Sequence, residues 1–196
     1  MRSDGTDRLH QTLLCFSTVA FSWLATMAVH ESGHVVNAWL SGGRISRVVL
    51  HPWAFSRTDF AVNPHPLFVA WGGAAWGIVL PALVWAFFRL CFKRYVFLAA
   101  FFAGFCWIAN GAYLAGGILF PGGGDDAGVI VQHGGQRWQL LAFGLPAAAI
   151  GLWFWNGLGR HFGIGQAPDR VDRAAAWATT GLAFLIIILE IVCFGR

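Results

Sequence analysis

Apolar residues divide the chain into five long segments that are nearly free of charge. Uncharged runs cover residues 9–29, 66–88, 95–124 and 138–159, and a fifth run, 174–194, contains Glu190 as its one charged residue. Each run is at least about as long as the roughly 20 residues that an α-helix needs to cross a bilayer. The pattern predicts an all-α polytopic membrane protein with about five transmembrane helices.

The longest connection between these runs, residues 41–65, contains two β-prone pieces. They read "ISRVVLH" and "TDFAV", and "PWAFSR" separates them. This pattern predicts a short β-hairpin between the first two helices, lying on the membrane face, with an irregular amphipathic loop as the alternative. No connection is long enough to build a separate soluble core, so we expect residues 1–196 to form a single membrane domain.

Composition and charge support a multi-pass integral membrane protein. Hydrophobic residues make up 57% of the chain and charged residues 11%, against about 25% charged residues in an ordinary soluble domain. The net charge is +4, and the basic residues form no run of five or more, which argues against a nucleic-acid partner and suits loops beside a lipid bilayer. Eight of the thirteen basic residues lie on the side of the N-terminus, which favours a cytoplasmic N-terminus.

The stretch "MAVHESGHVV", residues 27–36, places ionisable groups at the end of the first apolar run. On a helix, His30 and His34 lie on one face one turn apart, so both imidazoles can reach one ion, with Glu31 on the adjacent edge. This is the H-E-x-x-H pattern of zinc hydrolases, in which the glutamate is the general base. Each such group costs on the order of 2.5 to 3.5 kcal/mol within a bilayer, and a bound metal would compensate for that cost.

Catalytic zinc usually has three protein ligands, so a third must come from another part of the chain. Because alternate ends of successive transmembrane helices face the same side, the end of the third helix meets the histidine pair, and Asp125 and Asp126 follow that end directly. The residue types that bind metals also occur at other positions, which stay open as weaker candidates: Asp59, His51, His65, His133 and Glu190.

Three of these motifs together resemble the site-2 protease family of intramembrane zinc metallopeptidases. They are "HESGH" in the first run, "AWGGAAWG" in the second, and a proline, glycine and aspartate motif after the third. The similarity spans roughly residues 20–135, which implies a metallopeptidase-like core of about residues 9–135. Two additional helices, at about 138–194, lie outside it.

The aspartate motif of that family has the form N-x-x-P-x-x-x-x-D-G. Pro121 and Asp126 reproduce its P-x-x-x-x-D part, whereas Ile118 and Ala127 stand at the asparagine and final glycine positions. The spacing therefore favours Asp126 as the third ligand, with Asp125 as the alternative.

The resemblance implies a function as well as a ligand set. It implies that His30, His34 and Asp126 bind Zn²⁺ and that Glu31 is the catalytic base of an intramembrane metalloendopeptidase. The expected substrate is a membrane protein or peptide, cut within or next to a transmembrane segment. Glycine-rich residues 122–124 could provide an aqueous pocket beside the site.

Two other classes of protein share this ligand set. Two histidines and one carboxylate also form the site of non-haem iron enzymes, so a membrane oxygenase is one alternative. A membrane protein that holds a metal ion without catalysis is the other. His51, His65, His133 and Asn110 are further candidates for contacts with substrate or oxyanion, although polar residues of this kind more often face solvent or join neighbouring helices.

Overall fold

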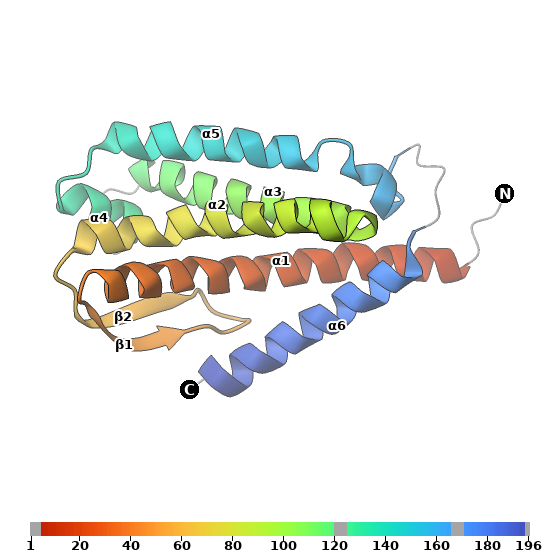
Figure 1. Cartoon of the computed structure of the whole chain (residues 1–196), viewed down its shortest axis with the longest axis horizontal. Coiled ribbons are helices and arrows are strands. Elements are labelled where there is room, and N and C mark those ends of the chain that lie inside the picture. The colour runs from red at the N-terminus through yellow and green to blue at the C-terminus, as the bar shows by residue number, and fades with distance from the viewer. Residues whose placement is uncertain (1–4, 120–124, 166–170, 195–196) are drawn as a thin grey trace.

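The computed structural model describes residues 5–119, 125–165 and 171–194, and it is 79% helical. In this part of the chain five stretches are helical, long and apolar enough to cross a membrane, which confirms the predicted architecture. They contain α1 (Gly5–Leu40), α2 (Pro66–Cys91), α3 (Val96–Gly116), α5 (Arg137–Trp155) and α6 (Arg173–Leu189), arranged as a bundle in which α6 crosses α1 at an angle (Figure 1).

Shorter elements connect these helices. The predicted hairpin is confirmed: β1 (Arg44–Val49) pairs antiparallel with β2 (Arg57–Val62), with an irregular register near Ile45. A short helix that the sequence pattern did not predict, α4 (Asp126–Gln132), precedes α5. The remaining elements are single turns: η1 (Lys93–Tyr95), η2 (Gly117–Leu119), η3 (Leu158–Phe162) and the π-helical η4 (Glu190–Phe194).

Helix α1 is longer than the uncharged run that predicted it. It contains 36 residues and is therefore about 54 Å long. It continues without a break past Val29 to Leu40, so His30, Glu31 and His34 all lie on regular helix. The first helix therefore does not end before the histidines.

The hairpin and α4 lie at one end of the bundle, beside the C-terminal end of α1 (Figure 1). The N-terminal end of α1 and η3 lie at the other end. The segments after α1 and after α3 therefore share one end, as the alternation of helix direction predicted. Residues 120–124, which include Pro121 and the glycines of the predicted aqueous pocket, lie outside the described residues.

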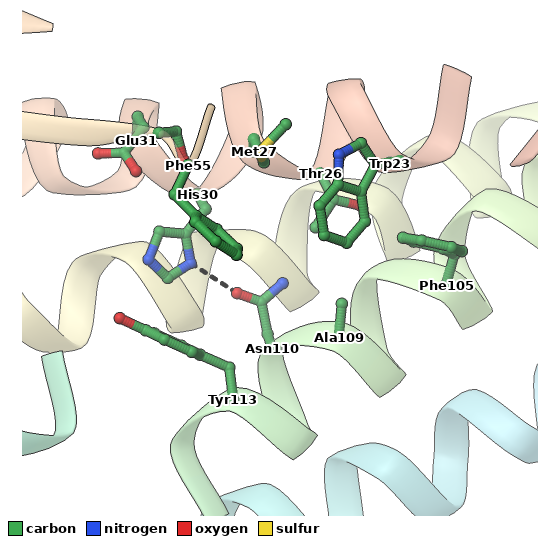
Figure 2. A pocket seen from close by; sticks show the side chains of 11 residues that line it. Trp23, Thr26, Met27, His30, Glu31, Phe55, Phe105, Ala109, Asn110 and Tyr113 are labelled. Carbon is green, nitrogen blue, oxygen red and sulfur yellow. Dashed lines mark hydrogen bonds between the residues drawn. The ribbon is translucent and has the colours of Figure 1, made fainter. Parts of the chain in front are cut away.

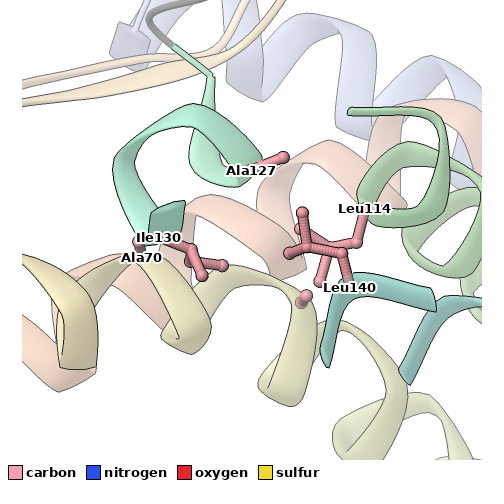
Figure 3. Packing of buried hydrophobic residues seen from close by; sticks show 6 residues of the cluster. Ala70, Leu114, Ala127, Ile130 and Leu140 are labelled. Carbon is pink, nitrogen blue, oxygen red and sulfur yellow. The ribbon is translucent and has the colours of Figure 1, made fainter. Parts of the chain in front are cut away.

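A small apolar cluster holds α4 in place. Ala127 and Ile130 of α4 are buried to 1% and 0% exposure. They pack against α2, α3 and α5 through Ala70, Ala74, Leu114 and Leu140 (Figure 3). The Asp125 side chain caps the helix by accepting a hydrogen bond from the Gly128 amide at 2.8 Å. This packing and capping orient the first residue of α4, Asp126.

Glycines allow the backbones of α3 and α5 to approach each other closely. A Cβ atom on Gly144 would collide with the Gly111 carbonyl oxygen and would lie 2.7 Å from the Ala115 Cβ atom. Gly104 and Gly151 repeat the arrangement two turns further along the same pair of helices. Between apolar helices such close approach supplies the dispersion contacts that hold them together, because lipid removes the hydrophobic driving force.

This contact predicts opposite results for two glycine substitutions. Gly144→Ala should lower the midpoint of thermal unfolding in detergent, because the new methyl group has to push against α3 backbone. Gly181→Ala on α6 should leave the midpoint unchanged or raise it. A Cβ atom there has no neighbour within 4 Å, and alanine gains about 0.5–1 kcal/mol over glycine in a helix. Equal midpoints for the two variants would contradict the assigned packing of α3 on α5.

Candidate metal centre

Three side chains from two helices converge on one point. The His30 and His34 rings are edge to face, with centroids 4.8 Å apart, and their Nε2 atoms are 3.1 Å apart. Oδ2 of Asp126 lies 2.8 Å from Nε2 of His30 and 3.3 Å from Nε2 of His34. In the described part of the chain, this is the one group of at least three His, Cys, Asp or Glu residues that could hold a metal ion.

The hydrogen bonds at Nδ1 of each imidazole ring determine which nitrogen carries the hydrogen. His34 Nδ1 lies 2.8 Å from the Val69 carbonyl oxygen, and His30 Nδ1 lies 2.7 Å from Oδ1 of Asn110. Both oxygens can only accept, so both Nδ1 atoms carry a hydrogen. A neutral imidazole protonated at Nδ1 has its lone pair at Nε2, which is the arrangement that a metal-binding histidine needs.

The donor set fits a metal ion. Both Nε2 atoms and a carboxylate oxygen point at one place, and three such atoms this close repel unless a proton or a metal ion lies among them. Ligand atoms about 2.0–2.1 Å from a tetrahedral zinc ion lie roughly 3.3 Å from one another, close to the observed separations of 2.8, 3.1 and 3.3 Å. The triad therefore has the spacing of a metal-binding site.

Asp126 is ionised at neutral pH. Burial alone would raise the pKa of its carboxyl group, but the contacts with His30 and His34 outweigh burial and lower that pKa to about 2. The side chain is 16% exposed, and the carboxylate that it presents is the form that binds metals.

Gly73 of α2 makes room for both imidazoles. A Cβ atom at this position would lie 2.5 Å from Nε2 of His30 and 2.5 Å from Nε2 of His34. Its neighbour Gly72 allows α2 to approach α1, because a Cβ atom there would meet the Gly33 carbonyl oxygen at 2.6 Å. The glycine pair of "AWGGAAWG" thus brings α2 directly against the face of α1 that carries the two imidazoles.

The other candidate ligands are not part of this triad. Asp125 points its side chain back to the Gly128 amide as the cap of α4, so Asp126 is the aspartate that contacts both histidines. Asp59 pairs with Arg57 on its own strand, and Glu190 is buried in η4. His51, His65 and His133 line neither of the two cavities that meet at the triad.

Glu31 lies beside the triad and is held by the hairpin. Its side chain is buried, with the residue 4% exposed, and its Oε2 atom accepts a hydrogen bond of 2.7 Å from the Thr58 hydroxyl group on β2. A carboxylate in this position can accept a proton from a water molecule held among the three ligands.

Two cavities meet at His30 and Glu31. One is mainly apolar, has a volume of about 300 Å³, and runs between α1 and α3 past Trp23, Phe105 and Ala109 (Figure 2). The other, also of about 300 Å³, lies between the hairpin and α4 and has more polar walls, to which Asn63 contributes. An apolar group and water can therefore approach the same point from two sides.

Several residues of the site escaped sequence reasoning. Thr58 looked like an ordinary strand residue, and Tyr113, whose ring packs edge to face on His30, looked like part of an apolar run. Asn110 was a candidate for contact with the oxyanion or with a neighbouring helix, but its contact with the ring of His30 was not predicted. The available signal was that it is the one Asn, Gln or charged residue between residues 95 and 119.

Comparison of this chain with protein-family models, with curated proteins and with solved structures found no match. The function proposed below therefore depends on the geometry of the site and on its sequence motifs.

The two neighbouring aspartates offer a matched test of the ligand assignment. Asp126→Asn should weaken Zn²⁺ binding by more than about 100-fold. Changing a group that only hydrogen-bonds a metal ligand typically costs roughly 10- to 100-fold, and the loss of a ligand should cost more. Asp125→Asn should bind Zn²⁺ like the wild type, because asparagine caps a helix about as well as aspartate. Calorimetric titration of metal-stripped protein in detergent measures both, and the reverse order of affinities would make Asp125 the ligand.

A methyl group at position 73 should damage the centre without changing any ligand. Gly73→Ala is expected to lower Zn²⁺ affinity because the new Cβ atom displaces both Nε2 atoms. Gly116→Ala, where a Cβ atom has no neighbour within 4 Å, is the control and should bind normally. Wild-type affinity in the Gly73 variant would show that α2 does not lie against the imidazoles.

Proposed function

We propose that this chain is a multi-pass integral membrane zinc metalloendopeptidase. Its substrate is another membrane protein or a membrane-bound peptide, and it hydrolyses a peptide bond within or next to a transmembrane segment. The proposal combines the resemblance of the sequence motifs to site-2 proteases with the arrangement of the described residues.

The single observation that carries the proposal is the position of Glu31 relative to the triad. His30, His34 and Asp126 hold their ligand atoms within 4.8 Å of one another, and Glu31 lines both cavities that open onto His30. A metal carrier needs the three ligands but has no use for a buried carboxylate beside them. A hydrolase needs that carboxylate to move a proton.

The chemistry requires one proton transfer in each direction. A zinc ion bound by the triad supplies a Lewis acid that acidifies water and polarises a peptide carbonyl group. Glu31 accepts a proton from the attacking water, whose oxygen bonds to the carbonyl carbon. Glu31 then gives that proton to the departing nitrogen as the C–N bond breaks, so that the products are a carboxylic acid and an amine and Glu31 returns to its initial state.

The two cavities suit a substrate that comes from lipid and a reaction that consumes water. The apolar cavity between α1 and α3 can receive an apolar side chain, whereas the polar cavity beneath the hairpin can admit water. A helical substrate keeps its backbone hydrogen-bonded in lipid, so it has to unwind locally before its carbonyl group reaches the triad.

Iron is the competing metal for a site of two histidines and one carboxylate. The buried Glu31 favours hydrolysis, because the iron site is defined by its three ligands and open positions alone. Metal analysis of protein purified without added metal separates the two, and one zinc per chain is the expected content.

The two glutamates of the chain provide a matched pair for testing catalysis. Glu31→Gln should reduce cleavage by about a hundredfold to ten-thousandfold, the usual contribution of general acid–base catalysis, while zinc content stays at the wild-type level. Glu190→Gln changes another buried carboxylate in the same way and should cleave normally. The probe is a quenched fluorescent peptide with a Leu- and Ala-rich segment interrupted by Asn-Gly, in detergent micelles.

Two results would contradict the peptidase assignment. One is cleavage at the wild-type rate by the Glu31→Gln variant. The other is a wild-type protein that contains zinc but cuts none of a panel of such peptides with the Asn-Gly break at different depths.

A further inference from the structure

The ligand His30 has a buried amide as its second contact. Its Nδ1 atom lies 2.7 Å from Oδ1 of Asn110 on α3, eighty residues further along the chain (Figure 2). Asn110 is 2% exposed, so water does not compete for this hydrogen bond. The contact joins α1 to α3 at the point where the two cavities meet.

The orientation of the amide is determined by a second hydrogen bond. Its Nδ2 atom donates to the Cys106 carbonyl oxygen, one turn earlier on α3, at 2.8 Å. Since the nitrogen side of the amide is occupied in this way, the oxygen side faces His30 and must accept from Nδ1. Nε2, on the other side of the His30 ring, then faces Asp126.

A glycine on a third helix makes room for this amide. A Cβ atom at Gly77 of α2 would lie 2.5–2.6 Å from the amide atoms of Asn110. Gly77 follows Gly73 by one helical turn. The missing side chains on this face of α2 leave space for the two imidazoles at Gly73 and for the Asn110 amide at Gly77. The Asn110 amide is therefore packed between α1, α2 and its own helix.

We infer that Asn110 is a positioning residue of the metal centre: it holds His30 in the Nδ1–H tautomer and in the ring orientation that directs Nε2 at the ion. This inference rests on the metal centre of the proposed function but not on peptidase activity. Changing a group that orients a metal-binding histidine typically costs 10- to 100-fold in metal affinity. We expect the same loss when Asn110 cannot accept.

The competing explanation is that Asn110 only ties two helices together, as buried amides in membrane proteins often do. Asn37 provides the matched control for that role. It lies on α1, is 7% exposed, and bridges α1 to α2 by donating to the Phe68 carbonyl oxygen and accepting from the Trp76 indole. These side-chain hydrogen bonds go to α2 and not to a ligand of the triad, so its loss should affect folding but not the ion.

The experiment compares Asn110→Leu, Asn110→Asp and Asn37→Leu as full-length, metal-stripped proteins titrated with Co²⁺. Asn110→Leu should bind Co²⁺ about 10- to 100-fold more weakly and shift its visible absorption bands, because the His30 ring turns. Asn110→Asp keeps an acceptor oxygen and should retain wild-type affinity or exceed it. Asn37→Leu should retain both the affinity and the spectrum of the wild type. If Asn110→Leu does not yield folded protein, Asn110→Ala takes its place.

Equal Co²⁺ affinities in Asn110→Leu and the wild type would overturn the inference. So would a loss that Asn110→Asp or Asn37→Leu shares, since that loss would reflect folding alone. These outcomes are distinct from failure of the proposed function: a wild type that binds Co²⁺ and cuts no peptide would end the peptidase proposal while leaving the role of Asn110 intact.

Discussion

The candidate metal centre depends on three polar groups that converge on one point. The Nε2 atoms of His30 and His34 lie 3.1 Å apart, and Oδ2 of Asp126 lies within 3.3 Å of both. Each group is fixed by a second contact. The Nδ1 atoms of His30 and His34 hydrogen-bond to Asn110 and to the Val69 carbonyl oxygen, and buried apolar residues fix α4, which carries Asp126. A site built in this way is preorganised for a cation, and the cation in turn would tie α1 to α4.

Close helix packing is what makes such a site possible in an apolar environment. The helices supply few polar groups, so each must be placed by backbone contact. Gly72 and Gly73 bring α2 against α1, Gly77 admits an amide from α3, and Gly144 lets α5 lie on α3. Glycines therefore lie at each of these helix contacts, from α1 against α2, through α2 against α3, to α3 against the outer helix α5.

The sequence predicted the helices, the hairpin and the histidine pair, because each follows from local periodicity or spacing. The P-x-x-x-x-D spacing favoured Asp126, the aspartate that contacts both imidazoles. What could not be predicted depends on residues distant in sequence. Asn110 meets His30 across 80 residues, Thr58 meets Glu31 across 27, and the seven-residue helix α4 is too short to have an apolar period of its own.

The carboxylate of Glu31, the general base of the proposed reaction, is positioned by a hydrogen bond from the hairpin. Glu31 belongs to α1, yet the hydrogen bond on its carboxylate comes from Thr58 on β2. A two-stranded hairpin is marginally stable alone, so its position depends on what it packs against. Because the same hairpin forms a wall of the polar cavity, water that enters there in the proposed reaction passes the strand that bonds to Glu31. The hairpin is thus both a boundary of the cavity and the support of Glu31, whereas His30, His34 and Asp126 lie on helices.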